Sequence, residues 1–177
     1  SDWIVNHQIM AALHTGKFLL WMPGSSLIRE SHSLPEGRST LDFVGMNYYG
    51  RIFTKIVLRA PFIKISEGPG PKSDLGWEVF PQGLESSLQD IWKRYKLPIM
   101  ITENGLADAG DSMRKEFIHE HIESMRRAQK SGVPVLGYFH WSLTDNFEWA
   151  LGLKPRFGLI EVDYSTQERR PRPSYYF

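Results

Sequence analysis

The segment Pro98-Ile-Met-Ile-Thr-Glu-Asn-Gly105 decides the fold class of this 177-residue chain. Its residues from 98 to 101 are apolar without alternation, which is typical of a short strand buried on both faces of a parallel sheet. Glu103 follows directly, and Gly105 permits a sharp turn after it. We therefore expect a buried strand at 98–102 with a carboxylate at its carboxyl end.

Helices and strands alternate on both sides of this segment. The predicted elements, in chain order, are a helix at 3–13, a strand at 41–49, a helix at 83–95, the strand at 98–102, a helix at about 113–130 and a strand at 135–141. Apolar residues recur every three or four positions in the helices. Asp2 is the expected cap of the first helix, and Ser112 or Asp111 that of the third. Buried strands alternating with amphipathic helices predict an α/β fold with a parallel sheet.

Three further segments lack such periodicity. Residues 18–40 contain two breaks with Pro and Gly, so we expect a long loop there. Residues 51–82 contain one β-prone run, at 52–58, followed by a Pro- and Gly-rich loop of a length that usually serves a site. The tail at 169–173 reads either as a Pro-rich ligand or, preferably, as a linker before a final helix.

The composition excludes several classes of function. Twenty-one Lys and Arg against 20 Asp and Glu give a net charge of +1, and no basic block could neutralise a row of phosphates, which excludes nucleic acid as a partner. No apolar run approaches the roughly 20 residues that span a membrane. The chain has no cysteine, which excludes thiolate chemistry and leaves the compartment open, with the cytoplasm slightly favoured.

The histidines offer no metal site. His119 and His121 are two residues apart on a predicted helix, so their side chains point to different faces, and no His-Glu-x-x-His motif is present. We interpret both as part of a solvated helix face. Neither a metal nor a cofactor is predicted.

Polar residues gather where the predicted strands end. Asn47 and Tyr49 end the first strand, Glu103 the second, and His140 and Trp141 the third. Sites of α/β folds are built at this edge of the sheet. A buried, unpaired carboxylate there would cost several kcal/mol, so Glu103 is a candidate catalytic group, the alternative being an exposed loop residue. Taken alone, Asn47 and Tyr49 fit core or turn positions better.

Aromatic and acidic residues are interleaved after the last strand. The residues concerned are Trp141, Phe147, Trp149 and Phe157 with Asp145 and Glu148. Ring faces stack on sugars and carboxylates accept hydrogen bonds from hydroxyls, so this stretch resembles a sugar-binding wall. A hydrophobic cluster beneath a loop is an equally good interpretation.

Four stretches together resemble the C-terminal part of glycoside hydrolase family 1, the β-glucosidase and β-galactosidase family of (β/α)8 barrels. They are Asp42-Phe-Val-Gly-Met-Asn-Tyr-Tyr49, Gly76-Trp-Glu-Val-Phe-Pro-Gln-Gly-Leu84, Ile101-Thr-Glu-Asn-Gly105, and Trp141-Ser-Leu-Thr-Asp-Asn-Phe-Glu-Trp149 followed by Arg156-Phe-Gly158. Their order and spacing make the resemblance highly specific. It implies an α/β fold that is the C-terminal portion, about three strand–helix units, of a (β/α)8 TIM barrel.

The resemblance also implies a role for each candidate residue. Glu103 would be the nucleophile that attacks the anomeric carbon of the sugar, and Tyr49 would hydrogen-bond its carboxylate and orient it. The residues implied to bind the sugar are Asn47, Trp141, Glu148, Trp149 and Phe157. Because a carboxylate facing the sugar's 6-position would repel a phosphate, Glu148 favours a neutral β-D-glycoside, such as a β-glucoside, as substrate.

One part of the family pattern is absent. Retaining hydrolysis needs two carboxyl groups about 5–5.5 Å apart. The family supplies the second, the acid/base, from an Asn-Glu-Pro motif that this chain lacks. A complete barrel also takes about 250 residues. We therefore expect residues 1–177 to form a partial catalytic domain, without the N-terminal half and the end of the last helix, whose partner is the complementary N-terminal half of the same barrel.

Three functions follow from these patterns. The leading one is a retaining β-glycoside hydrolase fragment that is inactive without its N-terminal complement. The alternative is a non-catalytic glycan-binding module or pseudoenzyme, which keeps the sugar wall but lacks the acid/base. A scaffold fragment that merely folds is the weakest interpretation.

Overall fold

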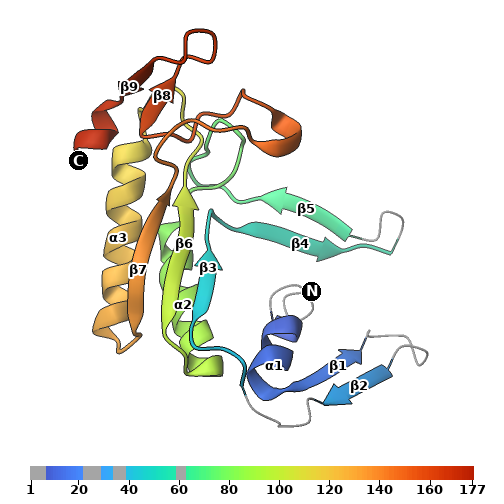
Figure 1. Ribbon diagram of the computed structural model, residues 1–177. Coiled ribbons are helices and arrows are strands. Elements are labelled where there is room, and N and C mark those ends of the chain that lie inside the picture. The colour runs from blue at the N-terminus through green and yellow to red at the C-terminus, as the bar shows by residue number, and fades with distance from the viewer. Residues whose placement is uncertain (1–6, 22–28, 34–38, 59–62) are drawn as a thin grey trace.

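Three parallel strands form the central sheet. The computed structural model describes residues 7–21, 29–33, 39–58 and 63–177. The strands of this sheet, in their hydrogen-bonded order, are β3 (Val44–Asn47), β6 (Ile99–Gly105) and β7 (Val135–Trp141). Their carboxyl ends point the same way (Figure 1). The predicted α/β fold with three parallel strands is confirmed.

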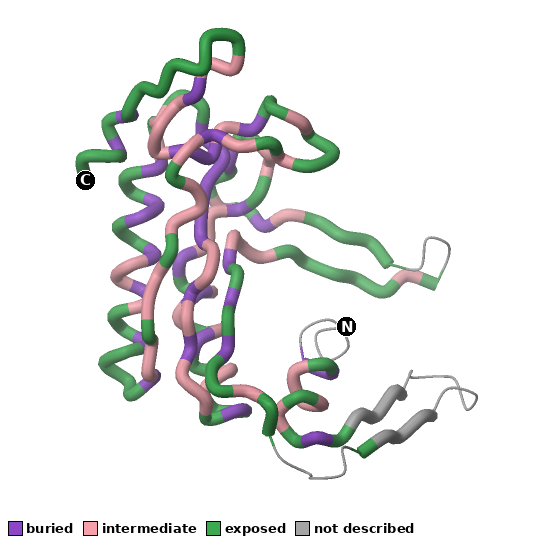
Figure 2. The backbone as a smooth tube through the Cα atoms, viewed as in Figure 1, coloured by how far each residue is buried: buried purple, intermediate pink, exposed green. Residues whose placement is uncertain are grey.

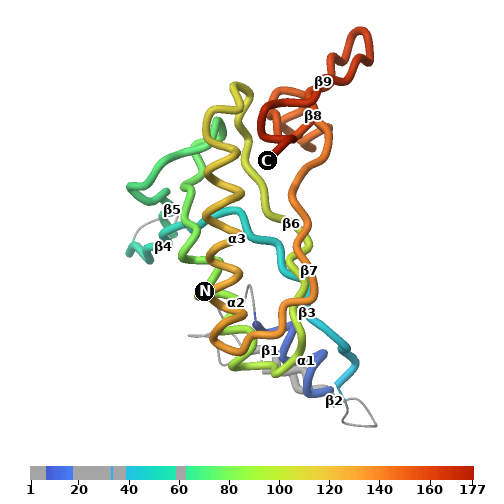
Figure 3. Tube along the Cα trace, turned by 90° about the vertical axis from the view of Figure 1, so that its left-hand side faces the viewer, coloured from blue at the N-terminus to red at the C-terminus, as the bar shows by residue number. Residues whose placement is uncertain are grey.

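Two helices connect these strands and cover one face of the sheet. They are α2 (Pro81–Tyr95) and α3 (Arg114–Lys130), which pack side by side (Figure 3). Leu84 and Leu88 of α2 and Ile101 of β6 are completely buried between the two layers. Burying each such side chain contributes about 1.5–3 kcal/mol, so this apolar core holds the helices on the sheet.

A shorter helix, α1 (Gln8–Thr15), precedes the sheet. It confirms the second half of the predicted helix at 3–13, while residues 3–6 and the expected cap Asp2 lie outside the described residues. Gly16 ends the helix with a φ of 68°. This left-handed conformation suits a glycine at a helix C-terminus.

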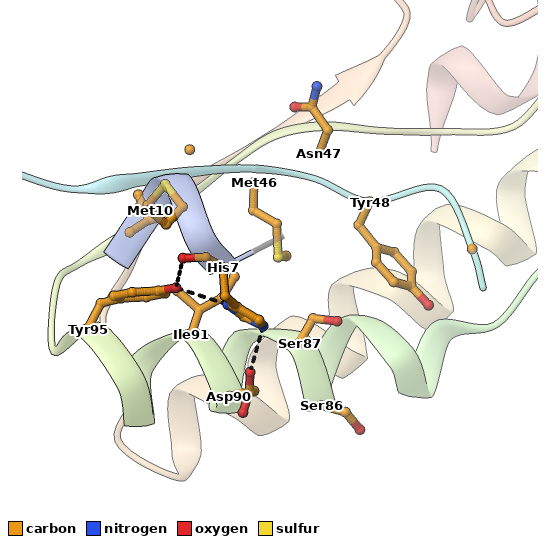
Figure 4. Close-up of a pocket in the computed structure, with 13 residues that line it drawn as sticks. His7, Met10, Met46, Asn47, Tyr48, Ser86, Ser87, Asp90, Ile91 and Tyr95 are labelled. Carbon is orange, nitrogen blue, oxygen red and sulfur yellow. Dashed lines mark hydrogen bonds and ion pairs between the residues drawn. The ribbon is translucent and has the colours of Figure 1, made fainter. Parts of the chain in front are cut away.

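A cavity of about 530 Å³ lies between α1, β3 and α2 (Figure 4). Met10, Met46 and Ile91 contribute apolar side chains to its lining. His7 Nδ1 and the Tyr95 hydroxyl are 2.9 Å apart in the same lining. The cavity therefore lies on the helix-covered side of β3.

A hairpin of β1 (Lys17–Trp21) and β2 (Arg29–Ser33) follows α1. The prediction of a long loop at 18–40 is therefore wrong over these two strands, and residues 22–28 and 34–38 lie outside the described residues. The hairpin is formed by hydrogen bonds between two neighbouring segments. The Pro and Gly residues within 18–40 do not indicate whether the segments around them pair as strands.

A second hairpin, β4 (Ile52–Ile56) and β5 (Ile63–Glu67), extends away from the sheet and is mostly exposed (Figure 2). The β-prone run at 52–58 is confirmed as a strand. The prediction of a loop after it is wrong over β5. Ile63 and Ile65 alternate with polar residues, which is the signal that should have indicated a strand.

The start of α3 is capped by a residue that the sequence did not single out. Asp108 Oδ2 accepts hydrogen bonds from the backbone N–H groups of Met113, at 2.8 Å, and Arg114, at 3.0 Å. The predicted caps, Ser112 and Asp111, do not bind these groups. Instead, Asp111 accepts bonds from the backbone and hydroxyl of Ser174, so it anchors the C-terminal tail.

The tail pairs with a neighbouring strand. It forms β9 (Arg169–Pro171), which is antiparallel to β8 (Ile160–Val162), and a 3₁₀ turn, η3 (Pro173–Tyr176). The predicted linker is therefore a paired strand over Arg169–Pro171, and the helix predicted after it stays a prediction.

His121 corrects the interpretation of α3 as carrying two solvated histidines. Its side chain is completely buried, its Nδ1 lies 2.7 Å from the Phe117 carbonyl oxygen, and its ring stacks on that of Phe117 with centroids 3.9 Å apart. Burial lowers the pKa of His121 to about 4, so it is neutral at pH 7. His119 is exposed, as predicted.

The outer strands of the central sheet each keep one edge without a strand partner among the described residues. Leu136 and Phe139 on β7 are 56% and 58% exposed, and Phe43 beside β3 is 45% exposed. Exposed edges with large apolar residues are normally covered in native proteins. This sheet is therefore suited to continue on both sides.

None of the helices in the described part of the chain is both long and apolar enough to cross a membrane.

Candidate active site

A tyrosine and a glutamate meet where β3 and β6 end. The Tyr49 hydroxyl donates a hydrogen bond to Glu103 Oε2 at 2.8 Å. Burial raises the pKa of Tyr49 well above its usual range, and the bond to Glu103 and the charges of Glu103 and Glu148 raise it further. Tyr49 therefore stays a protonated donor at physiological pH. The hydrogen bond expected between Tyr49 and Glu103 is present.

Glu103 lies in a bulge of β6. Where β3 advances one residue to Asn47, β6 advances two, from Ile101 to Glu103. On its other side, β7 advances two residues to His140 while β6 advances three, to Asn104. An extra residue reverses which face the following side chains occupy. Glu103 is consequently half-buried at the site, and Asn104 is buried.

The close approach of β6 and β7 brings a tryptophan next to this bulge. A Cβ atom on Gly105 would lie only 1.7 Å from the carbonyl oxygen of Trp141, so only a glycine fits there. The expected sharp turn at Gly105 is absent, because β6 continues through this residue. Trp141 ends β7 and pairs with Gly105 across the sheet.

Asn47 points away from the helices. Figure 4 shows its side chain on the opposite side of β3 from Tyr48 and Met46. Its Oδ1 accepts a hydrogen bond from the Thr102 hydroxyl at 2.7 Å, and the residue is exposed. Asn47 thus stands beside Glu103 on the face of the sheet that the helices leave open.

Two aromatic side chains pack against the ring of Tyr49. The rings of Phe157 and Trp77 contact it edge-on, with centroids 6.2 Å and 5.7 Å away. Phe157 is only 1% exposed, and its expected part in the sugar subsite stays a prediction. It packs against Tyr49, and its burial could not be inferred from the motif.

Trp77 also lies beside Tyr49, and no motif singled it out as an individual residue. It is 36% exposed and, with Tyr49, Arg51 and Glu67, lines a cavity of about 230 Å³. The neighbouring Glu78 is buried and accepts hydrogen bonds from Arg51 Nε, at 2.6 Å, and from a backbone N–H. This ion pair fixes the loop that carries Trp77. The stretch beginning at Gly76 was the available signal.

Asp145 is a structural anchor and not part of a sugar-binding surface. Its buried carboxylate lies 3.1 Å from Arg156 Nη1 and 3.1 Å from Arg172 Nη2, and it accepts the backbone N–H groups of Gly158 and Val162. Burial alone would raise the pKa of Asp145, but these hydrogen bonds lower it below its usual value. The expected wall therefore lacks this carboxylate.

Two aromatic residues of the expected wall are open to solvent. Phe147 and Trp149 are 63% and 81% exposed, and Trp149 begins the 3₁₀ turn η2 (Trp149–Leu151). Glu148 is half-buried, and its Oε2 accepts a hydrogen bond from Asn146 Nδ2 at 2.9 Å. Neither Glu148 nor Trp149 hydrogen-bonds to Glu103 in the described part of the chain. Glu148 acts on this pair through its negative charge, which helps to raise the pKa of Tyr49.

The side chains of the described residues form no cluster of three or more histidines and carboxylates that could hold a metal ion.

Comparison with known proteins places these features in a family. The model of glycosyl hydrolase family 1 matches residues 29–177. The beta-galactosidase of Saccharolobus solfataricus is 42% identical over 148 residues, which are 77% of this chain and 30% of that protein. The beta-glycosidase from Pyrococcus horikoshii has a TM-score of 0.86 and 37% identity, over 99% of this chain and 40% of its own. The beta-glucosidase from Thermotoga maritima in complex with glucoimidazole has a TM-score of 0.73 and 39% identity, over 78% and 33%.

These relatives also define the fold of the central sheet. The structural neighbours are (β/α)8 barrels, so β3, β6 and β7 with their helices are part of such a barrel. The chain spans 30–40% of the length of these three relatives. With the family model matched from Arg29 to Phe177 and a barrel segment that superimposes on solved members, this chain belongs to glycosyl hydrolase family 1.

Proposed function

We propose that this chain is the C-terminal part of a retaining β-glycosidase whose nucleophile is Glu103. The observation that carries the proposal is the 2.8 Å hydrogen bond from the Tyr49 hydroxyl to Glu103 Oε2, at the carboxyl ends of parallel barrel strands. A nucleophilic carboxylate needs one oxygen oriented and the other free to attack. Tyr49 holds Oε2, and Oε1 has no hydrogen-bond partner among the described residues.

In the proposed reaction, Glu103 Oε1 attacks the anomeric carbon and forms a glycosyl ester while the bond to the leaving oxygen breaks. The leaving oxygen takes its proton from the acid/base of the completed barrel. Water, deprotonated by the same acid/base, then attacks the anomeric carbon and releases the carboxylate of Glu103. Tyr49 keeps its proton throughout, because its pKa lies far above neutrality.

The remaining proposed contacts are with the sugar. Asn47 is beside Glu103 on the open face of the sheet, and Trp141 ends the adjacent strand. We assign Glu148 and Trp149 to the outer hydroxyls, Glu148 as acceptor and the indole N–H of Trp149 as donor. A carboxylate at that place repels phosphate, which supports a neutral β-D-glycoside as substrate.

The acid/base is proposed to come from an N-terminal complement that supplies the other strands of the barrel. The free edges of β3 and β7 and the 30–40% coverage of relatives support this assignment. We call the chain joined to such a complement the completed barrel. The N-terminal part of the Pyrococcus horikoshii beta-glycosidase, which this chain does not cover, is one source of it.

The test of this function is to trap the glycosyl ester. A 2-deoxy-2-fluoro β-glycoside with a good leaving group slows both steps, so the completed barrel should accumulate one covalent label. Peptide mapping by mass spectrometry is expected to place it within residues 99–105, on Glu103. A label on Glu148 or Asp145 would contradict the assignment. A completed barrel that binds glycosides but is never labelled and has no turnover would favour the glycan-binding alternative.

Glu148→Gln should weaken catalysis without abolishing it. Hydrogen bonds to charged groups contribute about 1.5–3 kcal/mol, so we expect kcat/KM of the completed barrel to fall about 10- to 100-fold. The loss should shrink with substrates that lack the 4- or 6-hydroxyl, because those hydroxyls are the proposed donors. Kinetics on this substrate series provide the measurement.

Glu120→Gln, on the exposed face of α3, is the matched control for this loss of one negative charge and should leave kcat/KM unchanged. An equal loss on substrates with and without the 4- and 6-hydroxyls would contradict the role of Glu148.

A further inference from the structure

Asn104, the residue after Glu103, is completely buried and uses both ends of its side-chain amide. Nδ2 donates to the carbonyl oxygen of Tyr48 at 2.7 Å, and Oδ1 accepts from the Tyr138 hydroxyl at 2.7 Å. Because a carbonyl oxygen only accepts, the NH₂ group must face Tyr48. Asn104 thereby links β6 to β7 and to the residue that follows β3.

These contacts complete a closed loop of covalent and hydrogen bonds that includes Tyr49 and Glu103. The Tyr48 carbonyl belongs to the peptide unit that precedes Tyr49, and the Tyr49 hydroxyl donates to Glu103, which is covalently joined to Asn104. The Tyr48 N–H also donates to the Glu103 carbonyl oxygen at 2.8 Å. Hydrogen bonds on both sides of Tyr48 therefore set the position from which Tyr49 reaches Glu103.

The bulge makes these hydrogen bonds necessary. A bulged residue leaves the regular ladder, so its backbone is held less firmly by strand pairing than that of its neighbours. The extra residue of β6 falls between Ile101 and Asn104. Directly after the bulge, the amide of Asn104 is hydrogen-bonded to β7 through Tyr138 and to Tyr48, which follows β3.

We propose that Asn104 is a positioning residue, which holds the Tyr49 hydroxyl against Glu103 by way of the Tyr48 carbonyl. Tyr138 orients the amide of Asn104 for this purpose. The inference rests on the proposed role of Glu103 and adds a residue that does not touch the sugar. A displacement of about 1 Å at a reacting group can cost about 100-fold in rate. Loss of the two hydrogen bonds of the Asn104 amide should therefore lower kcat measurably.

A double-mutant cycle with Tyr49 tests the proposal in the completed barrel. Asn104→Ala is expected to lower kcat about 10- to 100-fold, with little change in KM, and Tyr138→Phe to lower it in the same direction by less. In the Tyr49→Phe background, the hydroxyl that Asn104 positions is gone. In that background, Asn104→Ala and Tyr138→Phe should each lower kcat by no more than about 2-fold. A difference of about 2-fold is the usual error of additivity between independent substitutions.

The controls separate positioning from general stability. Ser124→Ala removes a buried hydroxyl that is bound to Arg127 on α3, and its effect on kcat should be small and equal in both backgrounds. Thermal unfolding is followed for every variant. If Asn104→Ala does not fold, the cycle with Tyr138→Phe, which deletes one oxygen, decides the matter.

Two outcomes overturn the proposal at different levels. Losses for Asn104→Ala or Tyr138→Phe that are equally large in both Tyr49 backgrounds, with Glu103→Gln inactive, overturn only the positioning role. Full activity of Glu103→Gln overturns the proposed nucleophile and the positioning role with it.

Discussion

Glu103→Gln should lower turnover of an aryl β-glucoside by the completed barrel by about 10⁴-fold or more. The substitution keeps the size of the side chain and its ability to accept the Tyr49 hydrogen bond, which is 2.8 Å long in the structure. It removes the charged oxygen that is proposed to attack the anomeric carbon. Thermal unfolding and the affinity for a non-reacting sugar should therefore change little, so the loss falls on kcat.

A second variant distinguishes loss of the nucleophile from loss of structure. Glu103→Ala opens space at the anomeric carbon, where a small external anion such as azide can attack and form a glycosyl azide of inverted configuration. Recovery of turnover with azide is expected for Glu103→Ala and not for Glu148→Ala. Activity of Glu103→Gln within 10-fold of the parent would show that another group attacks the sugar.

The parts of the fold that the sequence predicts well are those whose pattern is local. Apolar runs without alternation mark β6 and β7, and three- to four-residue periodicity marks α2 and α3, with bounds within about two residues at most ends. Burial of Leu84 and Leu88 follows directly from that periodicity. The order of these elements then implies the parallel sheet.

The prediction fails where structure depends on contacts outside the spacing of known local motifs. Asp108 caps α3 from five residues before Met113, outside the spacing of ordinary capping motifs. Arg172 reads as part of a basic, Pro-rich tail, yet it is buried against Asp145, 27 residues earlier. No local pattern reports either contact, since both depend on how loops return to the sheet.

The same distinction applies to the candidate site. Glu103 and Tyr49 could be named from motifs, and their hydrogen bond places them together as expected. Phe157 belongs to a motif as well, but its ring packs against Tyr49, and the motif does not indicate on which side of the loop the ring lies. The bulge at Glu103 and the two hydrogen bonds of the Asn104 amide were not predicted, because a shift in strand register does not change the periodicity of apolar residues.

Residues 1–177 alone should hydrolyse an aryl β-glucoside only at the background rate. Loss of general acid catalysis forfeits about 10²–10⁴-fold, and the proposed acid/base lies in the complement. Within the described residues, the central sheet also has two free edges, with Leu136 and Phe139 more than half exposed. Assays of the purified chain, with its mass verified, provide the measurement.

Adding the complement should restore turnover, because it covers the free edges of β3 and β7 and brings a second carboxyl group to about 5–5.5 Å from Glu103. The matched control is the same mixture with Glu103→Gln, which should stay at background and so exclude activity of the complement itself. Substantial turnover by the verified 177-residue chain alone would contradict the division of the two carboxylates. It would require the acid to be one of this chain's own groups, and Glu148, whose charge already reaches Tyr49, would then be the first to examine.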